Sequence, residues 1–127
     1  MPNRVYDTRF LVEALYSKDP KFQRKADSEK RNREKYVSAV TVHELYRLTL
    51  TREGRDTARL RVSLVQKSFK VIPVDEQVAQ VSAELRQKYR LSMGDSMIAA
   101  TAAILNATCV SDDPHFNLIK EIHTMWI

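Results

Sequence analysis

The chain has 127 residues, enough to bury one hydrophobic core without disulfides or structural metals. With two glycines, four prolines and no repetitive or Ser/Gly-rich stretch, it is expected to form one domain over residues 1–127. No apolar run approaches the roughly 20 residues that cross a bilayer, and the one cysteine, Cys109, has no intramolecular partner. These features exclude a disulfide scaffold and predict a soluble protein of the reducing cytoplasm, with no membrane contact.

The formal net charge of +5 is unevenly distributed along the sequence. Residues 18–35 contain eight Lys or Arg against four acids, and residues 47–70 contain seven against two, whereas the remainder is net acidic. Basic surfaces bind phosphate backbones with release of counterions, so this separation suits an enzyme that processes a polyanion at an acidic site. Solubilising helix faces are also often basic, and the charge excess alone does not separate the two interpretations.

Hydrophobic periodicity predicts alternating strands and helices, beginning with a short strand. In the first half the predicted elements are a strand at 4–6, a helix at 8–16, a charged helix from Asp19-Pro20 to about Lys35, a strand at 36–40, a helix that opens at 41–44 and, after a break near Gly54, a helix containing Leu60, Leu64 and Val65. Proline directly after Asp19 is typical of a helix start.

The second half continues the same alternation. Its predicted elements are a strand at 69–74, a helix at 76–89, a buried small-apolar helix at 97–105, a strand at 108–110, a short helix at 114–120 and an edge strand at 123–127. Repeated strand-helix-strand units pair their strands in parallel. The sequence therefore predicts an α/β fold, a three-layer α/β/α sandwich around a mostly parallel sheet.

Acidic residues occur at four of the predicted junctions between elements. Asp7 follows the first strand, Glu44 and Asp95 open two helices, and the pair Asp112-Asp113 follows the fourth strand. In open parallel α/β sheets the ligand crevice lies beyond the carboxyl ends of the strands, so we expect these side chains to meet at one edge. Carboxylates without a Cys or His cluster favour Mg²⁺ or Mn²⁺ over zinc. Such an ion activates water for attack on a phosphodiester.

Each of these acids also has a purely structural interpretation. Thr41 and Glu44 have the spacing of a capping box, and Asp95 suits the positive end of its helix dipole. Asp7 suits an N-cap, and Asp112-Asp113 before a proline is an ordinary turn or helix-start sequence. Helix capping does not explain why all four positions fall at junctions on one predicted sheet edge, so the set as a whole favours a site.

Four segments contain these acids, and they occur in a fixed order along nearly the whole chain. They are Val5 to Leu11 (VYDTRFL), Ser38 to Leu45 (SAVTVHEL), Leu91 to Ala102 (LSMGDSMIAATA) and Val110 to Phe116 (VSDDPHF). Together they resemble the motifs of a PIN domain, and in particular those of the small VapC-type toxins of prokaryotic toxin-antitoxin systems. Any one motif is weak, whereas the ordered set is specific.

The resemblance implies a Mg²⁺- or Mn²⁺-dependent endoribonuclease with an acidic, metal-binding pocket. The residues that match the family pattern of this pocket are Asp7, Glu44, Asp95 and Asp113, with Asp112 as the adjacent alternative to Asp113. Thr8 and Ser96 are expected to donate hydrogen bonds behind these ligands, although short hydroxyls beside helix starts are more often caps.

One position departs from the family pattern, because Arg9 stands where the family commonly has Asn. An arginine there would neutralise the pocket or meet a substrate phosphate. Arg52, Arg55 and Arg59 are further predicted RNA-binding residues, since they share one helical stripe if the break at Gly54 is mild. Salt bridges to neighbouring acids are the structural alternative for that stripe.

The resemblance also implies partners. A small co-encoded antitoxin is expected to insert a segment with a basic residue into the acidic groove, and the chain is expected to form a homodimer. Since no base-reading code is visible, an RNA substrate would be recognised through shape or single-stranded context.

Two other functions remain as alternatives to the nuclease. A non-catalytic RNA-binding or assembly module of the same fold would keep the basic faces and show no cleavage. A phosphoacceptor signalling domain would require an acidic pair after the first strand, where Asp7 stands alone.

Overall fold

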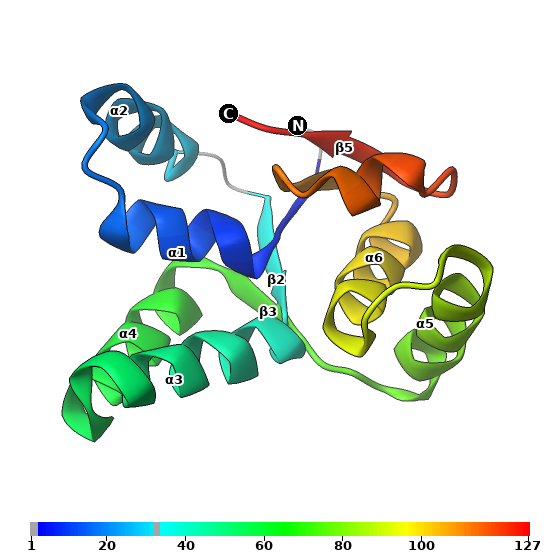
Figure 1. Ribbon diagram of the computed structural model, residues 1–127, viewed down its shortest axis with the longest axis horizontal. Coiled ribbons are helices and arrows are strands. Elements are labelled where there is room, and N and C mark those ends of the chain that lie inside the picture. Colours follow the sequence, from blue (N-terminus) through cyan, green and yellow to red (C-terminus); the bar gives the residue numbers. More distant parts are fainter. Residues whose placement is uncertain (1–2, 32–33) are drawn as a thin grey trace.

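The centre of the computed structural model, which describes residues 3–31 and 34–127, is a parallel sheet of five strands (Figure 1). The strands are β1 (Arg4–Tyr6), β2 (Lys35–Ser38), β3 (Lys70–Ile72), β4 (Thr108–Val110) and β5 (His123–Met125). They lie in the order β3-β2-β1-β4-β5, and all four neighbouring pairs are parallel. The chain therefore leaves β1 on one side to build β2 and β3 and returns on the other side to build β4 and β5.

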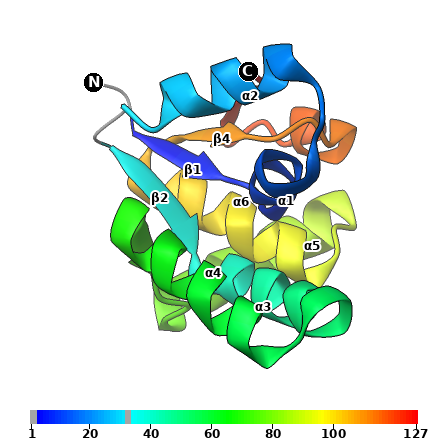
Figure 2. The same cartoon turned by 90° about the vertical axis from the view of Figure 1, so that its left-hand side faces the viewer.

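Helices cover both faces of this sheet. They are α1 (Thr8–Tyr16), α2 (Pro20–Glu29), α3 (Ala39–Glu53), α4 (Arg55–Ser68), α5 (Glu76–Tyr89), α6 (Met93–Leu105) and the short 3-10 helix η1 (Pro114–Leu118). Figures 1 and 2 show α1 to α4 on one side of the strands and α5 with α6 on the other. The predicted three-layer α/β/α fold is confirmed. In the described part of the chain, no helix is long and apolar enough to cross a membrane.

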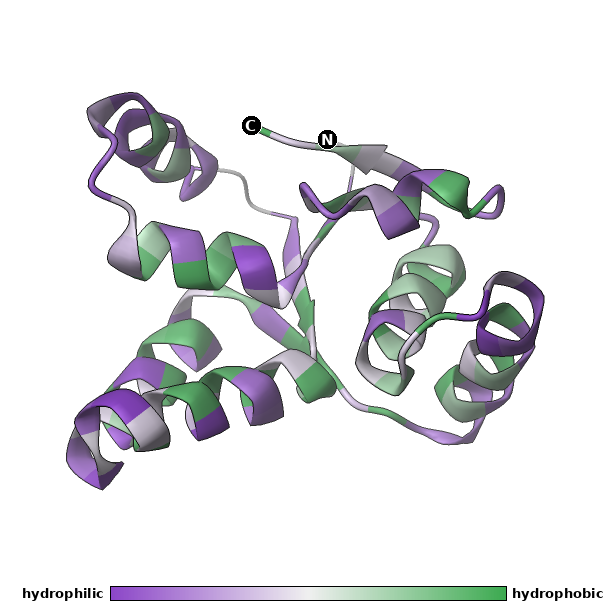
Figure 3. Cartoon of the chain, viewed as in Figure 1, coloured by the Kyte–Doolittle hydropathy of each residue, from purple (hydrophilic) through white to green (hydrophobic). Residues whose placement is uncertain are grey.

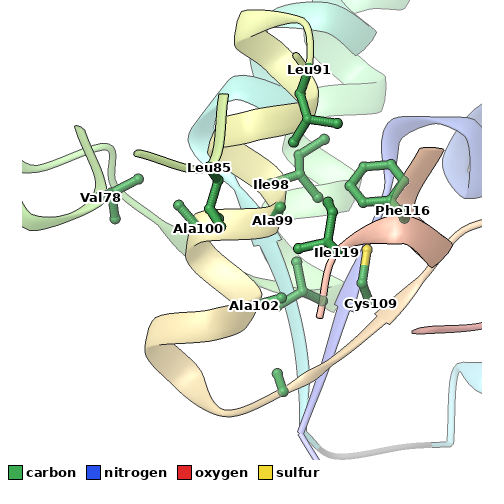
Figure 4. Close-up of a cluster of buried hydrophobic side chains, with 12 residues drawn as sticks. Val78, Leu85, Leu91, Ile98, Ala99, Ala100, Ala102, Cys109, Phe116 and Ile119 are labelled. Atoms are coloured by element: carbon green, nitrogen blue, oxygen red, sulfur yellow. The ribbon is translucent and has the colours of Figure 1, made fainter. Parts of the chain in front are cut away.

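Alternating side chains of the strands divide the core into two clusters. Val5 and Cys109 belong to the cluster on the α5–α6 side, together with Ile98, Phe116 and other buried residues. Figure 4 shows Cys109 beside Ile119 and Phe116 in this cluster. Among the described residues, helix α6 supplies four of the twelve buried members of this cluster, more than any other element, which explains why its sequence has no polar face and why it is pale green in Figure 3. A helix that is apolar all round is expected to be central in the fold.

The second cluster is aromatic and lies under α1. Tyr6 is fully buried, with its ring centroid 4.7 Å from that of Phe10 and 5.3 Å from that of Phe69. Trp126, close to the end of the chain, packs with its ring centroid 6.1 Å from Phe10 and 5.7 Å from Phe22. These contacts tie α1, α2 and the last residues to the face of the sheet opposite α6.

Several predicted boundaries differ from the structure, and two of the differences have identifiable reasons. The charged helix α2 ends at Glu29 and not near residue 35, because Lys35 begins β2. The strand predicted at 36–40 ends at Ser38, whose side chain accepts a hydrogen bond from the backbone N–H of Val40 at 3.1 Å. This N-cap starts α3 at residue 39, so the apolar pair after Ser38 is helical.

Gly54 makes the connection between α3 and α4 sharp. Its backbone has φ 88° and ψ 177°, a region that residues with a side chain rarely adopt. The two helices pack closely against each other as a helical hairpin (Figure 2). The break at this position is therefore a reversal of chain direction.

We expect Gly54→Ala to lower the free energy of unfolding by about 1 to 3 kcal/mol, because alanine is strained at this φ although open space surrounds the site. Chemical denaturation compares the variant with Arg55→Ala, an exposed helical neighbour expected to change stability by about 0.5 kcal/mol or less. An unchanged stability of Gly54→Ala would contradict the assigned backbone conformation.

Candidate active site

Asp7 lies at the carboxyl end of the central strand β1 and is only 3% exposed. Its backbone N–H donates to the carbonyl of Val110 at 3.0 Å, which extends the β1–β4 pairing to this position. It occupies the N-cap position of α1, but its side chain makes no capping hydrogen bond. Its Oδ2 instead accepts a hydrogen bond from Ser111 Oγ at 2.6 Å. The carboxylate is therefore fixed by the neighbouring strand end and not by its own helix.

Glu44 lies in the second turn of α3 and is held by a residue of α1. Thr8 Oγ1 donates to Glu44 Oε1 at 2.6 Å. The capping box considered for Thr41 and Glu44 is wrong, because Ser38 is the N-cap and Thr41 is fully buried within the helix. Glu44 thus makes a contact between two layers of secondary structure that helix capping does not require.

Asp95 lies in the first turn of α6, as the structural alternative expected, and is half-buried. The helix begins at Met93 because the Ser92 side chain caps it, accepting from the backbone N–H of Asp95 at 3.2 Å. Gly94 brings this helix start close to α3, since a Cβ added there would lie 2.9 Å from Glu44 Oε2. The absence of a side chain at Gly94 leaves the space that the Glu44 carboxylate uses.

These three carboxylates line one open pocket of about 250 Å³ at the carboxyl edge of the sheet. The complete lining is Asp7, Thr8, Arg9, Val12, Glu13, Glu44 and Asp95. The structure therefore brings Asp7, Glu44 and Asp95 together from three separate parts of the sequence, between β1 and β4, where the order of the strands reverses.

The electrostatics of this pocket, here called the acid pocket, oppose the ionisation of Asp7 and Asp95. Burial, together with the negative charges of Asp95 and Glu44, raises the pKa of Asp7 to about 6, against the opposing hydrogen bond from Ser111. Burial and the charge of Asp113, followed by that of Glu44, raise the pKa of Asp95. Several negative charges in one partly desolvated space are expected to repel one another and to favour a bound cation.

The adjacent Asp112 and Asp113 have different surroundings. Asp113 caps η1 and accepts from the backbone N–H of His115 at 3.0 Å, while its charge also acts on Asp95. Asp112 is paired with Arg9, whose Nε donates to Oδ1 at 2.6 Å, and this arginine lowers the pKa of Asp112. Asp113 is thus coupled electrostatically to Asp95, whereas Asp112 is paired with Arg9.

The donor chemistry of the acid pocket fits a hard divalent cation. Oxygen atoms of Asp7, Glu44 and Asp95 face a common space, and Ser111 and Thr8 orient two of these carboxylates from behind. Within residues 3–31 and 34–127, no three His, Cys, Asp or Glu side chains stand close enough to one another to form a preformed metal site. The repulsion between like charges opposes such an approach.

The other predicted site residues lie at varied distances from the pocket. Thr8 and Arg9 line it, whereas Ser96 is fully buried beneath the start of α6 and donates to the carbonyl of Met93 at 2.7 Å. His43 and His115 are exposed, as expected for surface residues.

The three arginines predicted to share one helical stripe do not share one. Arg52 lies in the last turn of α3, about 12 Å along the helix axis from Glu44, and its guanidinium lies 4.8 Å from the ring centre of Tyr16. Arg55 and Arg59 belong to α4 and are exposed. The sharp turn at Gly54 separates the two sets, and none of these arginines lines the acid pocket.

Sequence reasoning did not assign roles to Ser111 and Gly94. Both lie within recognisable motifs, and Ser111 directly follows the strand that pairs with β1. A hydroxyl at that point could have been predicted to face Asp7 once the β1–β4 pairing was known. The role of Gly94 depends on the approach of α6 to α3, for which the sequence contains no signal.

Comparisons with known proteins agree with this geometry. A model of the PIN domain matches residues 4–122, and the chain therefore belongs to the PIN domain family. A direct sequence comparison with curated proteins found no match. The predicted resemblance to PIN domains is thus confirmed at the level of the family.

Several solved structures have a similar fold. DNA-bound VapBC from Salmonella typhimurium contains a chain with 17% identity and a TM-score of 0.82, with 99% of this chain and 98% of that chain covered. FitAcB from Neisseria gonorrhoeae gives 23% identity and a TM-score of 0.75, with 96% of each chain covered. VapC20 from Mycobacterium tuberculosis, a Sarcin-Ricin loop cleaving toxin, has 15% sequence identity to this chain and a TM-score of 0.75, with 91% of this chain and 94% of that chain covered. At these identities the similarity establishes the fold.

The raised pKa of Asp7 predicts a pH-dependent stability in the absence of metal. The folded state holds a proton up to about pH 6, whereas the unfolded chain releases it near its ordinary value of 3.8. Stability is therefore expected to fall as the pH rises from about 4 to 6, by up to about 3 kcal/mol.

At pH 7.5 in EDTA we expect Asp7→Asn to raise the free energy of unfolding by about 1 to 3 kcal/mol, because asparagine removes the buried charge and can still accept from Ser111. Denaturant titration at pH 4.5 and 7.5 measures both effects. Asp27→Asn, at an exposed position of α2, is the control and should change little. If Asp7→Asn were less stable than the wild type at pH 7.5, the ionised Asp7 carboxylate would not destabilise the folded protein.

Proposed function

We propose that this chain is a metal-dependent endoribonuclease that hydrolyses RNA phosphodiesters and acts as the toxin of a toxin-antitoxin pair. The observation that supports the proposal most is the acid pocket, in which Asp7, Glu44 and Asp95 converge at the carboxyl edge of the sheet of a PIN domain. The structurally similar VapC20 is a Sarcin-Ricin loop cleaving toxin, which agrees with the same class of reaction.

Four carboxylates are the proposed ligands of Mg²⁺ or Mn²⁺, directly or through water. They are Asp7, Glu44, Asp95 and Asp113, with Asp113 preferred over Asp112 because its charge acts on Asp95. When bound, such an ion lowers the pKa of water and neutralises charge that develops on the phosphate. Oxygen-only donors favour these hard cations over zinc.

The chain's own residues have distinct roles in this proposal. Ser111 holds Asp7 through the 2.6 Å hydrogen bond, and Thr8 holds Glu44 through another of the same length. Glu44, a residue of α3, would orient the attacking water or hold a second ion. The packing of α6 under the pocket fixes Asp95, and the burial of Asp7 excludes water from one side of the site.

An RNA substrate agrees with the distribution of charge. The whole chain has a net charge of +5 although its pocket is acidic. Phosphates on either side of the cleaved bond would therefore meet Lys and Arg side chains outside the pocket. Arg55 and Arg59, exposed on α4, remain candidate contacts for the RNA backbone away from the pocket. With such a substrate, the site of action would be the cytoplasm.

The proposed partner is a small antitoxin, and the proposed assembly is a homodimer of the toxin. Similar structures include toxin-antitoxin complexes from several bacteria, such as Klebsiella pneumoniae, although identity to that chain is 22%. An apolar pocket of about 330 Å³ lies between α1, α2 and α4, and its lining includes Leu15 and Leu64, which are 41% and 51% exposed. This surface would accept apolar side chains of the antitoxin, while a basic residue of the same partner would meet the acid pocket.

The central test is cleavage of a mixed labelled RNA pool with and without Mn²⁺ or Mg²⁺. We expect metal-dependent cutting by the antitoxin-free wild type and a loss of more than about a hundredfold in Asp7→Asn and Asp95→Asn, since even residues behind metal ligands contribute about 10- to 100-fold. Asp27→Asn serves as the control, because it removes an exposed carboxylate outside the pocket.

The outcomes of this test are distinct. Equal cutting by wild type and both site variants would identify a contaminating nuclease. A folded wild type that binds RNA without cutting it in either metal would replace the nuclease with the non-catalytic RNA-binding module.

Gly94→Ala separates activity from stability at the same site. Alanine suits a helix better than glycine by about 1 kcal/mol, and the atom it would meet, Glu44 Oε2, is at the end of a flexible side chain. We therefore expect unchanged or slightly raised stability, with metal-dependent cleavage reduced by about tenfold or more because Glu44 is displaced. Thermal unfolding and initial cleavage rates measure the two effects. Wild-type activity in this variant would remove Glu44 from the proposed machinery.

A further inference from the structure

We propose that Arg9 is a substrate-binding residue whose guanidinium, oriented by Asp112, binds a phosphate of the RNA at the mouth of the acid pocket. The inference rests on the proposed function and adds a named contact to it. Among the described residues that line the pocket, Arg9 is the one with a positive charge, beside three converging carboxylates and Glu13. A polyanion that approaches this pocket would meet that charge first.

The geometry of the Arg9–Asp112 pair fixes the direction of the guanidinium. Arg9 Nε donates to Asp112 Oδ1 at 2.6 Å, and Nη2 donates to Oδ2 at 3.2 Å. Two parallel bonds between a guanidinium and a carboxylate restrict rotation more than a single bond does. Arg9 is on α1 and Asp112 follows β4, so the pair spans the same junction that buries Asp7.

The pair leaves donors available for a ligand. A guanidinium has five N–H groups, and the contacts with Asp112 use two of them, on Nε and Nη2. Within the part of the chain that the structure describes, Nη1 has no hydrogen-bond acceptor. The side chain of Arg9 is 56% exposed, so the remaining N–H groups are accessible to phosphate oxygens.

The role of Asp112 in this proposal is to position Arg9, since the ion pair adds little to stability. An ion pair that is 56% and 33% exposed contributes little to folding. Without Asp112, however, Arg9 would be attracted by the carboxylates of the acid pocket, where its guanidinium would compete with a metal ion. The pair keeps the cation at the rim and out of the metal site. Asp112 is therefore a positioning residue for Arg9 and not a metal ligand.

A purely structural pair is the competing explanation. In that case Arg9 and Asp112 would only join α1 to the segment after β4, and removing either would alter stability without changing RNA binding. The two explanations differ in how RNA affinity depends on salt, because each protein–phosphate contact contributes about one unit to that dependence.

RNA binding is measured in the Asp95→Asn background, which is expected to bind without cutting, with a labelled single-stranded RNA of mixed sequence. We expect Arg9→Ala to weaken binding by about tenfold and to lower the salt slope by about one, because a charge-assisted contact is lost. Arg9→Lys should restore most of the slope. Arg24→Ala is the matched control, since this exposed arginine of α2 does not line the pocket.

The role of Asp112 is tested by Mn²⁺ binding in calorimetry. We expect Asp112→Asn to weaken Mn²⁺ binding by about tenfold, and the double variant Arg9→Ala/Asp112→Asn to restore it, because the competing guanidinium is gone. If Asp112 were itself a ligand, the double variant would bind no better than Asp112→Asn.

Two results of the RNA-binding experiment would overturn the proposal, in addition to a double variant that binds Mn²⁺ no better than Asp112→Asn. One is RNA affinity and salt slope in Arg9→Ala equal to those of its Asp95→Asn parent; with a wild type that still cleaves RNA, this leaves the nuclease intact and removes only the role of Arg9. The other is a parent that does not bind RNA, which together with an inactive wild type would remove both the nuclease and this contact.

Discussion

The burial of one carboxylate, Asp7, between the ends of β1 and β4 is the constraint on which the rest of the site depends. Its backbone continues the strand pairing with Val110, and its side chain accepts from Ser111, so neither can move without disturbing the centre of the sheet. Glu44 then approaches from α3, which packs against α1, and Asp95 approaches from α6 on the opposite face. The acid pocket lies where the helical layers of both faces meet the sheet edge. Bringing its carboxylates together costs free energy, and the packing of the core offsets this cost.

Much of the fold follows from local patterns in the sequence. The helix at 76–89 and the strands at 4–6 and 108–110 have the bounds that periodicity predicts, because their apolar residues have no competing arrangement. Prediction errors arise where a single polar side chain or a single backbone dihedral angle overrides the secondary-structure propensity of the neighbouring residues. The β-prone residues after Ser38 become helical because its hydroxyl caps α3, and the turn at Gly54 reverses the chain where a mild break was expected. Such effects depend on one hydrogen bond or one dihedral angle, which composition does not reveal.

The convergence of Asp7, Glu44 and Asp95 could be predicted because parallel strands present their carboxyl ends at one edge. The difference between Asp112 and Asp113 could not, since adjacent residues in an extended turn point in different directions and only packing decides their partners. Ser96 illustrates the same limit: beside Asp95 in sequence, it is turned into the helix and away from the pocket. Roles that depend on the approach of two helices, such as that of Gly94, require the tertiary structure.

The distance in sequence between the two sides of the pocket also has a consequence for when the site can exist. Asp7 and Ser111 are 104 positions apart, and their contact requires β4 to pair with β1, a strand synthesised much earlier. Contacts of such long range form only after a costly loop has closed. A nascent chain that has already folded α1 to α5 still lacks Ser111, Asp113 and the full burial of Asp7. Complete assembly of the pocket thus requires synthesis beyond Asp113, and a chain that terminates before Ser111 would not contain it.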